Sequence, residues 1–135
     1  MIRKTLTAAV LASATALTAL PAAAGGSLSF TVNAANPDEA RAIRAGLTLY
    51  QIARGVESGA FVNQDGSYNG AAIRQVAGGG SVGIIHQEGN GHAATLDQQG
   101  YGQSHGIFQF GNGANANVVQ TYHGQAGLTF QFGFD

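Results

Sequence analysis

Glutamine recurs at a nearly constant spacing through the second half of this chain. Seven glutamines are separated by 11, 12, 11, 11, 11 and 11 residues. An apolar residue or a threonine stands two positions before each of them. The glutamines are Gln64, Gln75, Gln87, Gln98, Gln109, Gln120 and Gln131, and the residues before them are Val62, Ile73, Ile85, Leu96, Ile107, Val118 and Thr129. Two columns that keep the same phase through seven units indicate a repeat domain over residues 60–135.

Each unit predicts one short strand followed by one turn. Residues at i and i+2 of a strand share a face, so the aliphatic residue and the glutamine point to the same side. Glycine stands two positions after most of the glutamines, where a turn must close the strand. An 11-residue period is also typical of a right-handed coiled coil, but each glycine would cost about 1 kcal/mol in a helix. Two units then make one coil, and we predict an all-β fold, a parallel β-solenoid.

Stacking the coils predicts two inward ladders of apolar side chains with a glutamine ladder beside each. One apolar ladder holds Val62, Ile85, Ile107 and Thr129, and the other holds Ile73, Leu96 and Val118. The position four before each glutamine is also inward, and only His105 among the seven residues there is not small, as a thin core requires. Each buried amide can donate to one neighbouring coil and accept from the other. No polar capping unit follows Gln131, so we expect open edges at both ends and a chain built to polymerise.

Residues 1–24 have the pattern of a secretory signal peptide. Arg3 and Lys4 open the chain, an apolar run extends from Leu6 to Leu20, and small residues end at Ala24. A membrane anchor would need about 20 apolar residues and usually a charged stop after them. The chain has no cysteine, so the secreted protein predicted here must be held together without disulfides.

Residues 25–59 form a pre-repeat segment with a strand and a helix. Polar and apolar residues alternate from Ser27 to Val32, which predicts a short half-buried strand. Asn36 and Pro37 are typical of a helix start, and Glu39 stands at the capping-box position. Apolar residues then recur at helical spacing up to Arg54, so we predict an amphipathic helix over residues 37–54.

Charge and composition argue against several classes of function. Removal of residues 1–24 leaves four arginines against seven acidic residues, a net charge of 4 − 7 = −3. No lysine or arginine follows Arg74, so the basic patch that a nucleic-acid partner requires is absent. Asp65, Glu88 and Asp97 fall in different units, and a thin solenoid offers no pocket for catalysis, so we expect no enzyme activity.

The aromatic residues and histidines of the repeat predict a function less clearly than the glutamines predict the fold. Phe108 and Phe130 are 22 residues apart, as are Phe110 and Phe132, on the face opposite the glutamines. These outward ladders suit bundling, attachment to a surface or docking of the helix, or they only stabilise the sheet. The histidines, His86, His92, His105 and His123, match no metal-ligand spacing. We interpret them as solvated turn residues, and we expect no metal and no cofactor.

The units resemble the curlin repeat, whose pattern is Gln-x-Gly-x-x-Asn-x-Ala-x-x-x-Gln. The stretch from Gln64 to Gln75 matches at every specified position. Later units drift, because His92 and Ala114 take the asparagine place of their units and Tyr122 takes a glycine place. The unit that begins at Gln98 has Gln103 and His105 where asparagine and alanine are expected.

The resemblance implies a curli-type subunit, major or minor, that assembles into an extracellular amyloid fibre for adhesion and biofilm matrix. Its partners would be itself and other curlin-like subunits, exported through a dedicated outer-membrane secretion pore with accessory factors. The fibre, or fimbrium, would lie at the outer cell surface. The alternative is a monomeric β-solenoid whose flat face recognises a surface, ice or carbohydrate ligand. A helix docked over one end would favour that alternative.

Overall fold

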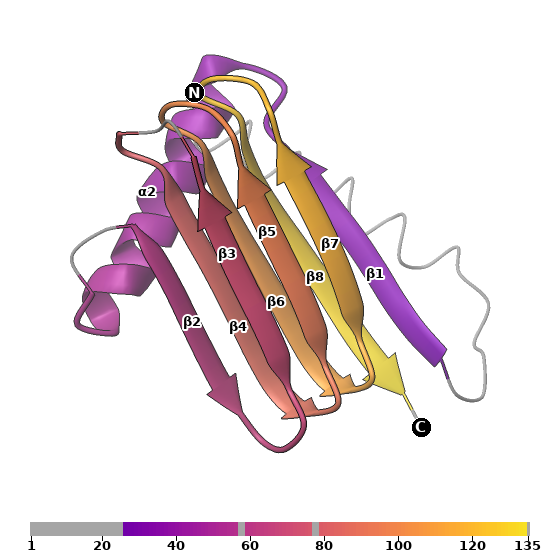
Figure 1. Ribbon diagram of the computed structural model, residues 1–135. Helices are drawn as coiled ribbons and strands as arrows, with labels where there is room; N and C mark the ends of the chain where they lie inside the picture. The colour runs from indigo at the N-terminus through magenta and orange to yellow at the C-terminus, as the bar shows by residue number, and fades with distance from the viewer. Residues whose placement is uncertain (1–25, 57–58, 77–78, 135) are drawn as a thin grey trace.

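The computed structural model describes residues 26–56, 59–76 and 79–134, and the repeat in it forms a parallel β-solenoid (Figure 1). Successive strands alternate between two sheets. One sheet holds β2 (Ala60–Asp65), β4 (Val82–Asn90), β6 (Ser104–Asn112) and β8 (Ala126–Phe134), and the other holds β3 (Gly70–Gln75), β5 (Ala93–Gln98) and β7 (Asn115–Gln120). The predicted fold class is confirmed. The predicted signal peptide lies outside the described residues.

The strand register follows the glutamine phase. Gln64 pairs with Gln87, which pairs with Gln109 and then with Gln131 in the larger sheet. In the smaller sheet Gln75, Gln98 and Gln120 are in register in the same way. The first coil spans 23 residues and the next two span 22 each, so the extra residue lies in the first coil.

The interior between the two sheets is thin and apolar. Ile85 and Ile107 of the larger sheet face Leu96 of the smaller one, and all three are fully buried. Ala94 and Ala116 complete this cluster at positions where a larger side chain would push the sheets apart. The alanines four positions before Gln98 and Gln120 therefore set the spacing of the sheets in this part of the core.

Glycines two positions after the glutamines allow the coils to stack closely at one turn. Gly66 and Gly89 have φ angles of 120°, a region that other residues rarely adopt. A Cβ atom on Gly66 would overlap the carbonyl oxygen of Gly89, and one on Gly89 would overlap that of Gly111. Only glycine fits these positions, which explains this column of the repeat.

The pre-repeat strand β1 (Gly26–Asn33) joins the larger sheet and pairs antiparallel with β8. The larger sheet thus has five strands in the order β1-β8-β6-β4-β2, and the smaller has three in the order β3-β5-β7. The strand was predicted from its alternation, but its place at the end of the solenoid was not. β2 and β3 form the opposite end, where the described residues add no further strand.

Helix α2 (Pro37–Ala53) begins where its local signals place it and ends one residue before the predicted end. The side chain of Asn36 accepts a hydrogen bond of 2.9 Å from the Glu39 amide. The Glu39 carboxylate in turn accepts one of 2.6 Å from the Ala35 amide. These reciprocal bonds satisfy amides that have no partner within the helix.

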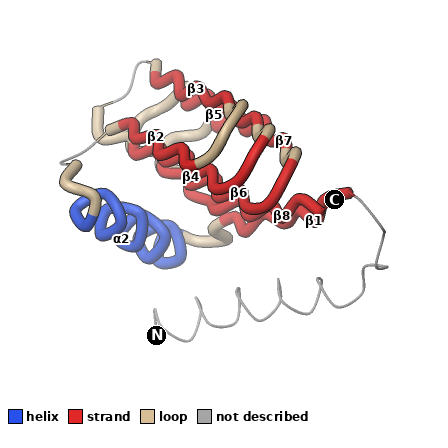
Figure 2. The backbone as a smooth tube through the Cα atoms, turned by 90° about the horizontal axis from the view of Figure 1, so that it is seen from below, coloured by secondary structure: helices blue, strands red, loops and turns tan. Residues whose placement is uncertain are grey.

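α2 packs on the outer face of the larger sheet and not over an end of the solenoid (Figure 2). Ile43 and Leu47 form a second buried cluster with Val82 and Ile84 of β4 and with Ala126 of β8. Gly106 makes room for the helix, since a Cβ atom there would lie 2.7 Å from the Leu47 side chain. The turns are tied to the helix as well, because Arg44 donates to the carbonyl oxygens of Gly80 and Gly102.

The packing of α2 on the larger sheet predicts that truncation of Leu47 strongly lowers the stability of the fold. Leu47 is 2% exposed, whereas Leu49 on the same helix is 66% exposed. We expect Leu47→Ala to lower the free energy of unfolding by about 2–5 kcal/mol, because it leaves a cavity between helix and sheet. Leu49→Ala, the matched control, should change it by less than about 0.5 kcal/mol. Urea unfolding measures both, and equal effects would show that the helix is not packed on the sheet.

Candidate functional site

The glutamine amides of the repeat form two continuous hydrogen-bonded ladders along the solenoid axis. In the larger sheet, Gln64 donates to Gln87 and Gln87 to Gln109 at 2.8 Å, and Gln109 donates to Gln131 at 2.6 Å. In the smaller sheet, Gln75 donates to Gln98 and Gln98 to Gln120, both at 2.8 Å. Each bond runs from the Nε2 atom of one coil to the Oε1 atom of the following coil. The ladders therefore have a direction.

The second hydrogen of each interior amide joins the two sheets. Gln87 donates at 2.9 Å to the carbonyl oxygen of Gly70, the first residue of β3. Gln98 donates at 2.9 Å to Val82, the first residue of β4. The bonds of Gln109, Gln120 and Gln131 to Ala93, Ser104 and Asn115 repeat the pattern. Sequence reasoning found the ladders but missed this bond, because the glutamine column does not show which carbonyl faces it.

The β2–β3 end of the solenoid is open. The Oε1 atoms of Gln64 and Gln75 accept no hydrogen bond from any described residue. Val62, the first residue of its apolar ladder, is 40% exposed, and Gln64 beside it is exposed too. An apolar residue and an unpaired acceptor at an unpaired strand edge are the features by which a sheet recruits another strand.

The β8 end differs, because β1 covers the edge of β8. The last donor of the ladder, Nε2 of Gln131, bonds to the Ser29 hydroxyl of β1 at 3.2 Å. The Thr31 and Thr129 hydroxyls lie 3.1 Å apart, and Phe30 stacks on Phe130 at a ring distance of 5.2 Å. The expectation of open edges at both ends is therefore wrong here. The capping strand precedes the repeat in the sequence and does not follow Gln131.

The inward face of β1 is polar, as a terminal cap requires. Ser29 and Thr31 are exposed, as is Asn33, because the smaller sheet adds no described strand opposite them. Thr129, on the last coil, also replaces the aliphatic residue of the earlier coils. The apolar core thus fades toward this end, while it stays aliphatic at Val62 on the open end.

The ladders predict that substitution of Gln98 lowers the stability of the fold far more than substitution of its neighbour Gln99. Gln98 is fully buried and bonds to Val82, Gln120 and Gln75, whereas Gln99 is exposed and bonds to Asp97. Gln98→Met should lower the free energy of unfolding by about 3 kcal/mol or more, since the buried Val82 carbonyl, the buried Gln120 amide and the half-buried Gln75 amide each lose a partner. Gln99→Met, the control, should cost under about 0.5 kcal/mol. Comparable losses in denaturant unfolding would contradict the ladder.

The turns carry polar ladders of their own, and His92 belongs to one of them. The Oδ1 atom of Asn69 accepts from the His92 amide at 2.9 Å, and Nδ1 of His92 accepts from the Ala114 amide at 3.1 Å. Since its Nδ1 accepts, the imidazole carries its proton on Nε2, 3.1 Å from the Glu88 carbonyl oxygen. His92 thus accepts a hydrogen bond from a backbone amide of the next coil, as Asn69 does at the asparagine position of its unit. At the other turn, Gln103 accepts from the Gly100 amide of its own turn and donates to the Tyr122 carbonyl of the next coil at 2.8 Å.

The four predicted phenylalanines lie on the outer face of the larger sheet in two stacked columns. Phe108 and Phe130 are 5.2 Å apart, and Phe110 and Phe132 are 5.5 Å apart. Phe30 of β1 extends the first column. Phe108 also packs against the cluster beneath α2, so part of this face is covered by the helix.

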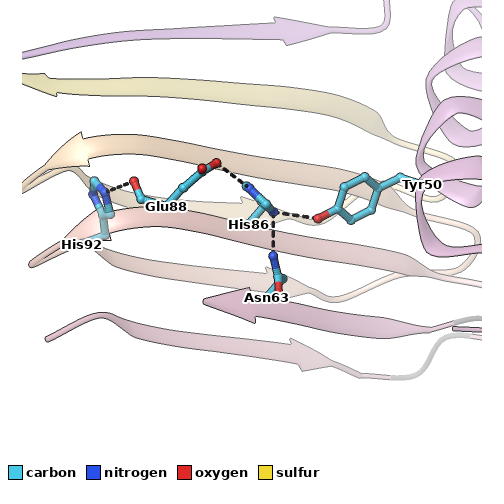
Figure 3. A network of polar contacts seen from close by, with 5 residues as sticks. All are labelled: Tyr50, Asn63, His86, Glu88 and His92. Atoms are coloured by element: carbon cyan, nitrogen blue, oxygen red, sulfur yellow. Dashed lines mark hydrogen bonds and ion pairs between the residues drawn. The ribbon is translucent and has the colours of Figure 1, made fainter. Parts of the chain in front are cut away.

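His86 of β4 lies one coil before Phe108 in the same column and joins the helix to the sheet (Figure 3). Its Nδ1 atom lies 2.7 Å from the Tyr50 hydroxyl and 3.1 Å from the Asn63 amide nitrogen. Its Nε2 atom lies 3.5 Å from the Glu88 carboxylate. Burial raises the pKa of Tyr50 above its usual 10, so the hydroxyl stays protonated at neutral pH.

His105 lies inside the solenoid and is 1% exposed. Its Nε2 atom is 2.8 Å from the Thr129 hydroxyl, and its Nδ1 atom has no partner among the described residues. Gly127, the next residue along the ladder, leaves room for the ring, because a Cβ atom there would lie 2.9 Å from it. Desolvation by burial lowers the pKa of His105 from 6.5 to about 4.

The interpretation of the histidines as solvated turn residues is wrong for three of the four. His86, His92 and His105 are buried, and His86 and His105 lie on strands. Only His123 is exposed in a turn, where it stacks on Tyr101. The face alternation already placed His105 inward, and His86 could have been placed in an aromatic column because it lies 22 residues before Phe108. Within the described residues, no group of three metal-ligating side chains comes together.

The burial of His105 predicts that the free energy of unfolding falls in mild acid. The unfolded chain binds a proton near pH 6.5 and the folded chain only near pH 4, so stability falls as the pH drops through that window. The full loss is about 3 kcal/mol at about 1.4 kcal/mol per pKa unit. Urea unfolding at pH 7.5 and pH 4.5 measures most of this loss. His105→Gln should remove this part of the dependence and His123→Gln should not; identical profiles for all three proteins would rule the mechanism out.

Comparisons with protein-family models, curated proteins and solved structures gave no match to this chain. The described residues also contain no helix with the length and apolar character needed to cross a membrane.

Proposed function

We propose that this chain is a secreted, non-enzymatic curlin-like subunit that self-assembles end to end into an extracellular fibre for adhesion and biofilm matrix. The observation that carries the proposal is the open β2–β3 end. This end has unpaired strand edges, the aliphatic side chain of Val62, and the Oε1 acceptors of Gln64 and Gln75, which point along the axis away from the solenoid. These groups lie in the same register as the ladders inside the solenoid.

The match of Gln64 to Gln75 with every specified position of the curlin pattern supports the same proposal. These residues form the β2–β3 coil, so the best match to the pattern is also the coil exposed at the open end. Export through an outer-membrane pore and assembly with other curlin-like subunits belong to the proposal as well. They rest on the resemblance alone.

A second candidate is a monomeric β-solenoid that binds a surface or carbohydrate ligand. The β1 cap favours it, because a capped end limits stacking. The helix gives it no support, since α2 lies on a side face and covers neither end of the solenoid. The binding module predicts a monomer at high concentration, with a melting temperature that rises when its ligand is added.

Substitution of Val62 by lysine tests the proposal. The incoming coil would bury the ammonium group, so we expect the critical concentration for fibre formation to rise at least about tenfold. The monomer should keep its fold, because Val62 is partly exposed there. Amyloid-dye fluorescence and electron microscopy measure assembly, and circular dichroism measures the fold.

Val119→Lys is the matched control. Val119 is 51% exposed on β7 and points away from the glutamines, so a lysine there stays in water and assembly should continue. An unsubstituted chain that stays monomeric and dye-negative at high concentration would overturn the proposed function and leave the binding module.

A further inference from the structure

β1 occupies the position that the next coil of a fibre would need. Its side chains reproduce contacts that one coil makes with the next. The Ser29 hydroxyl accepts from Gln131, as the Oε1 atom of the next glutamine does elsewhere in the ladder. Phe30 stacks on Phe130 at 5.2 Å, the same ring distance as between Phe108 and Phe130. β1 therefore imitates the following coil on its outer and its inner face.

The imitation is incomplete, which makes β1 a weaker partner than a real coil. β1 runs antiparallel to β8, whereas all the other neighbouring strands in both sheets are parallel. The Gln131–Ser29 bond is 3.2 Å long, against 2.6–2.8 Å between glutamines. β1 also covers β8 alone and adds nothing to the edge of β7.

Two copies fit together in only one sense along the axis. The open end presents glutamine acceptors, and the last donors, on Gln120 and Gln131, lie at the capped end. Two open ends would place acceptor against acceptor. Donor meets acceptor only when the open end of one copy faces the β8 end of another.

The strand count sets the rotation between the copies. The described repeat has four strands in one sheet and three in the other. A second copy in the same orientation would leave a missing strand beside β7. A copy turned by half a revolution about the axis places its β2 on β7 and its β3 on β8. Both glutamine ladders then continue without a break, and Val62 of the incoming copy lies over Val118.

We propose that β1 is a removable plug: the open β2–β3 end of a second copy displaces it from β8, docks half a turn around on β7 and β8, and leaves its own β1 as the new cap. This inference rests on the proposed function. The exchange replaces one antiparallel strand by two parallel strands and buries Val62, which is 40% exposed in the single chain. Until another copy displaces it, β1 would keep the β8 edge from pairing with other strands.

An engineered disulfide between β1 and β8 tests the plug. Thr31 and Thr129 are register partners with hydroxyls 3.1 Å apart, and the chain has no cysteine of its own. Thr31→Cys combined with Thr129→Cys is oxidised as a dilute monomer, and a non-reducing gel excludes exchange of β1 between copies. The reduced form of the same protein is the matched control, since it carries both substitutions without the bond.

The oxidised protein should elongate fibre seeds at least about tenfold more slowly than its reduced form, because the bond opposes release of β1. Its open end remains free, so it should also bind growing β8 ends and stop them. Added at substoichiometric amounts to unsubstituted subunits, it should halt growth at one end of each seed, as seen by single-fibre microscopy. Hydrogen exchange should show the β1 amides protected in the monomer and unprotected in the fibre.

The outcomes separate the two proposals. Equal elongation by the oxidised and reduced forms, growth at both ends in the presence of the oxidised form, or β1 amides still protected in the fibre would each overturn the plug while the fibre function stands. Failure of the unsubstituted chain to form fibres at all would overturn the proposed function, and the plug with it.

Discussion

Burying a side-chain amide is costly unless its oxygen and both its hydrogens find partners. This chain meets that condition by repeating the same amide at the same height in every coil. One hydrogen bonds to the next coil and the other to the facing sheet, as Gln98 shows with Gln120 and Val82. A shift of a strand by one residue would break both bonds and turn the glutamine outward. The amides therefore fix the register that the small apolar core alone would leave loosely defined.

The two ends of the solenoid solve the edge problem differently. At one end an antiparallel strand with a polar inner face closes the larger sheet. Next to it, Thr129 takes the place of the aliphatic residue in the last coil, so the core is already more polar there. At the other end the aliphatic and amide ladders stop without a cover. The helix takes no part in this difference, because it covers a side face, where His86 and Leu47 secure it. The uncovered end and the face that holds the helix are thus separate surfaces of one thin domain.

The sequence was sufficient to predict what repeats. The spacing of the glutamines predicted the coils, the register and the two inward ladders, and Asn36 with Pro37 predicted where the helix starts. The cap could not be predicted, because Ser29 and Gln131 are 102 residues apart and no local pattern links them. The docking face of the helix depends on Gly106, which looks like any other glycine in the sequence. The burial of His105 was within reach, since the alternation of faces already placed it inside.

The common direction of the amide bonds gives the solenoid an electrical polarity. Every ladder glutamine points its oxygen toward β2 and its nitrogen toward β8. The side-chain dipoles therefore add along the axis, with partial negative charge at the uncovered end and partial positive charge at the other. A stack of such subunits would keep this orientation from one tip to the opposite tip, so the two tips of a filament would attract ions of opposite sign.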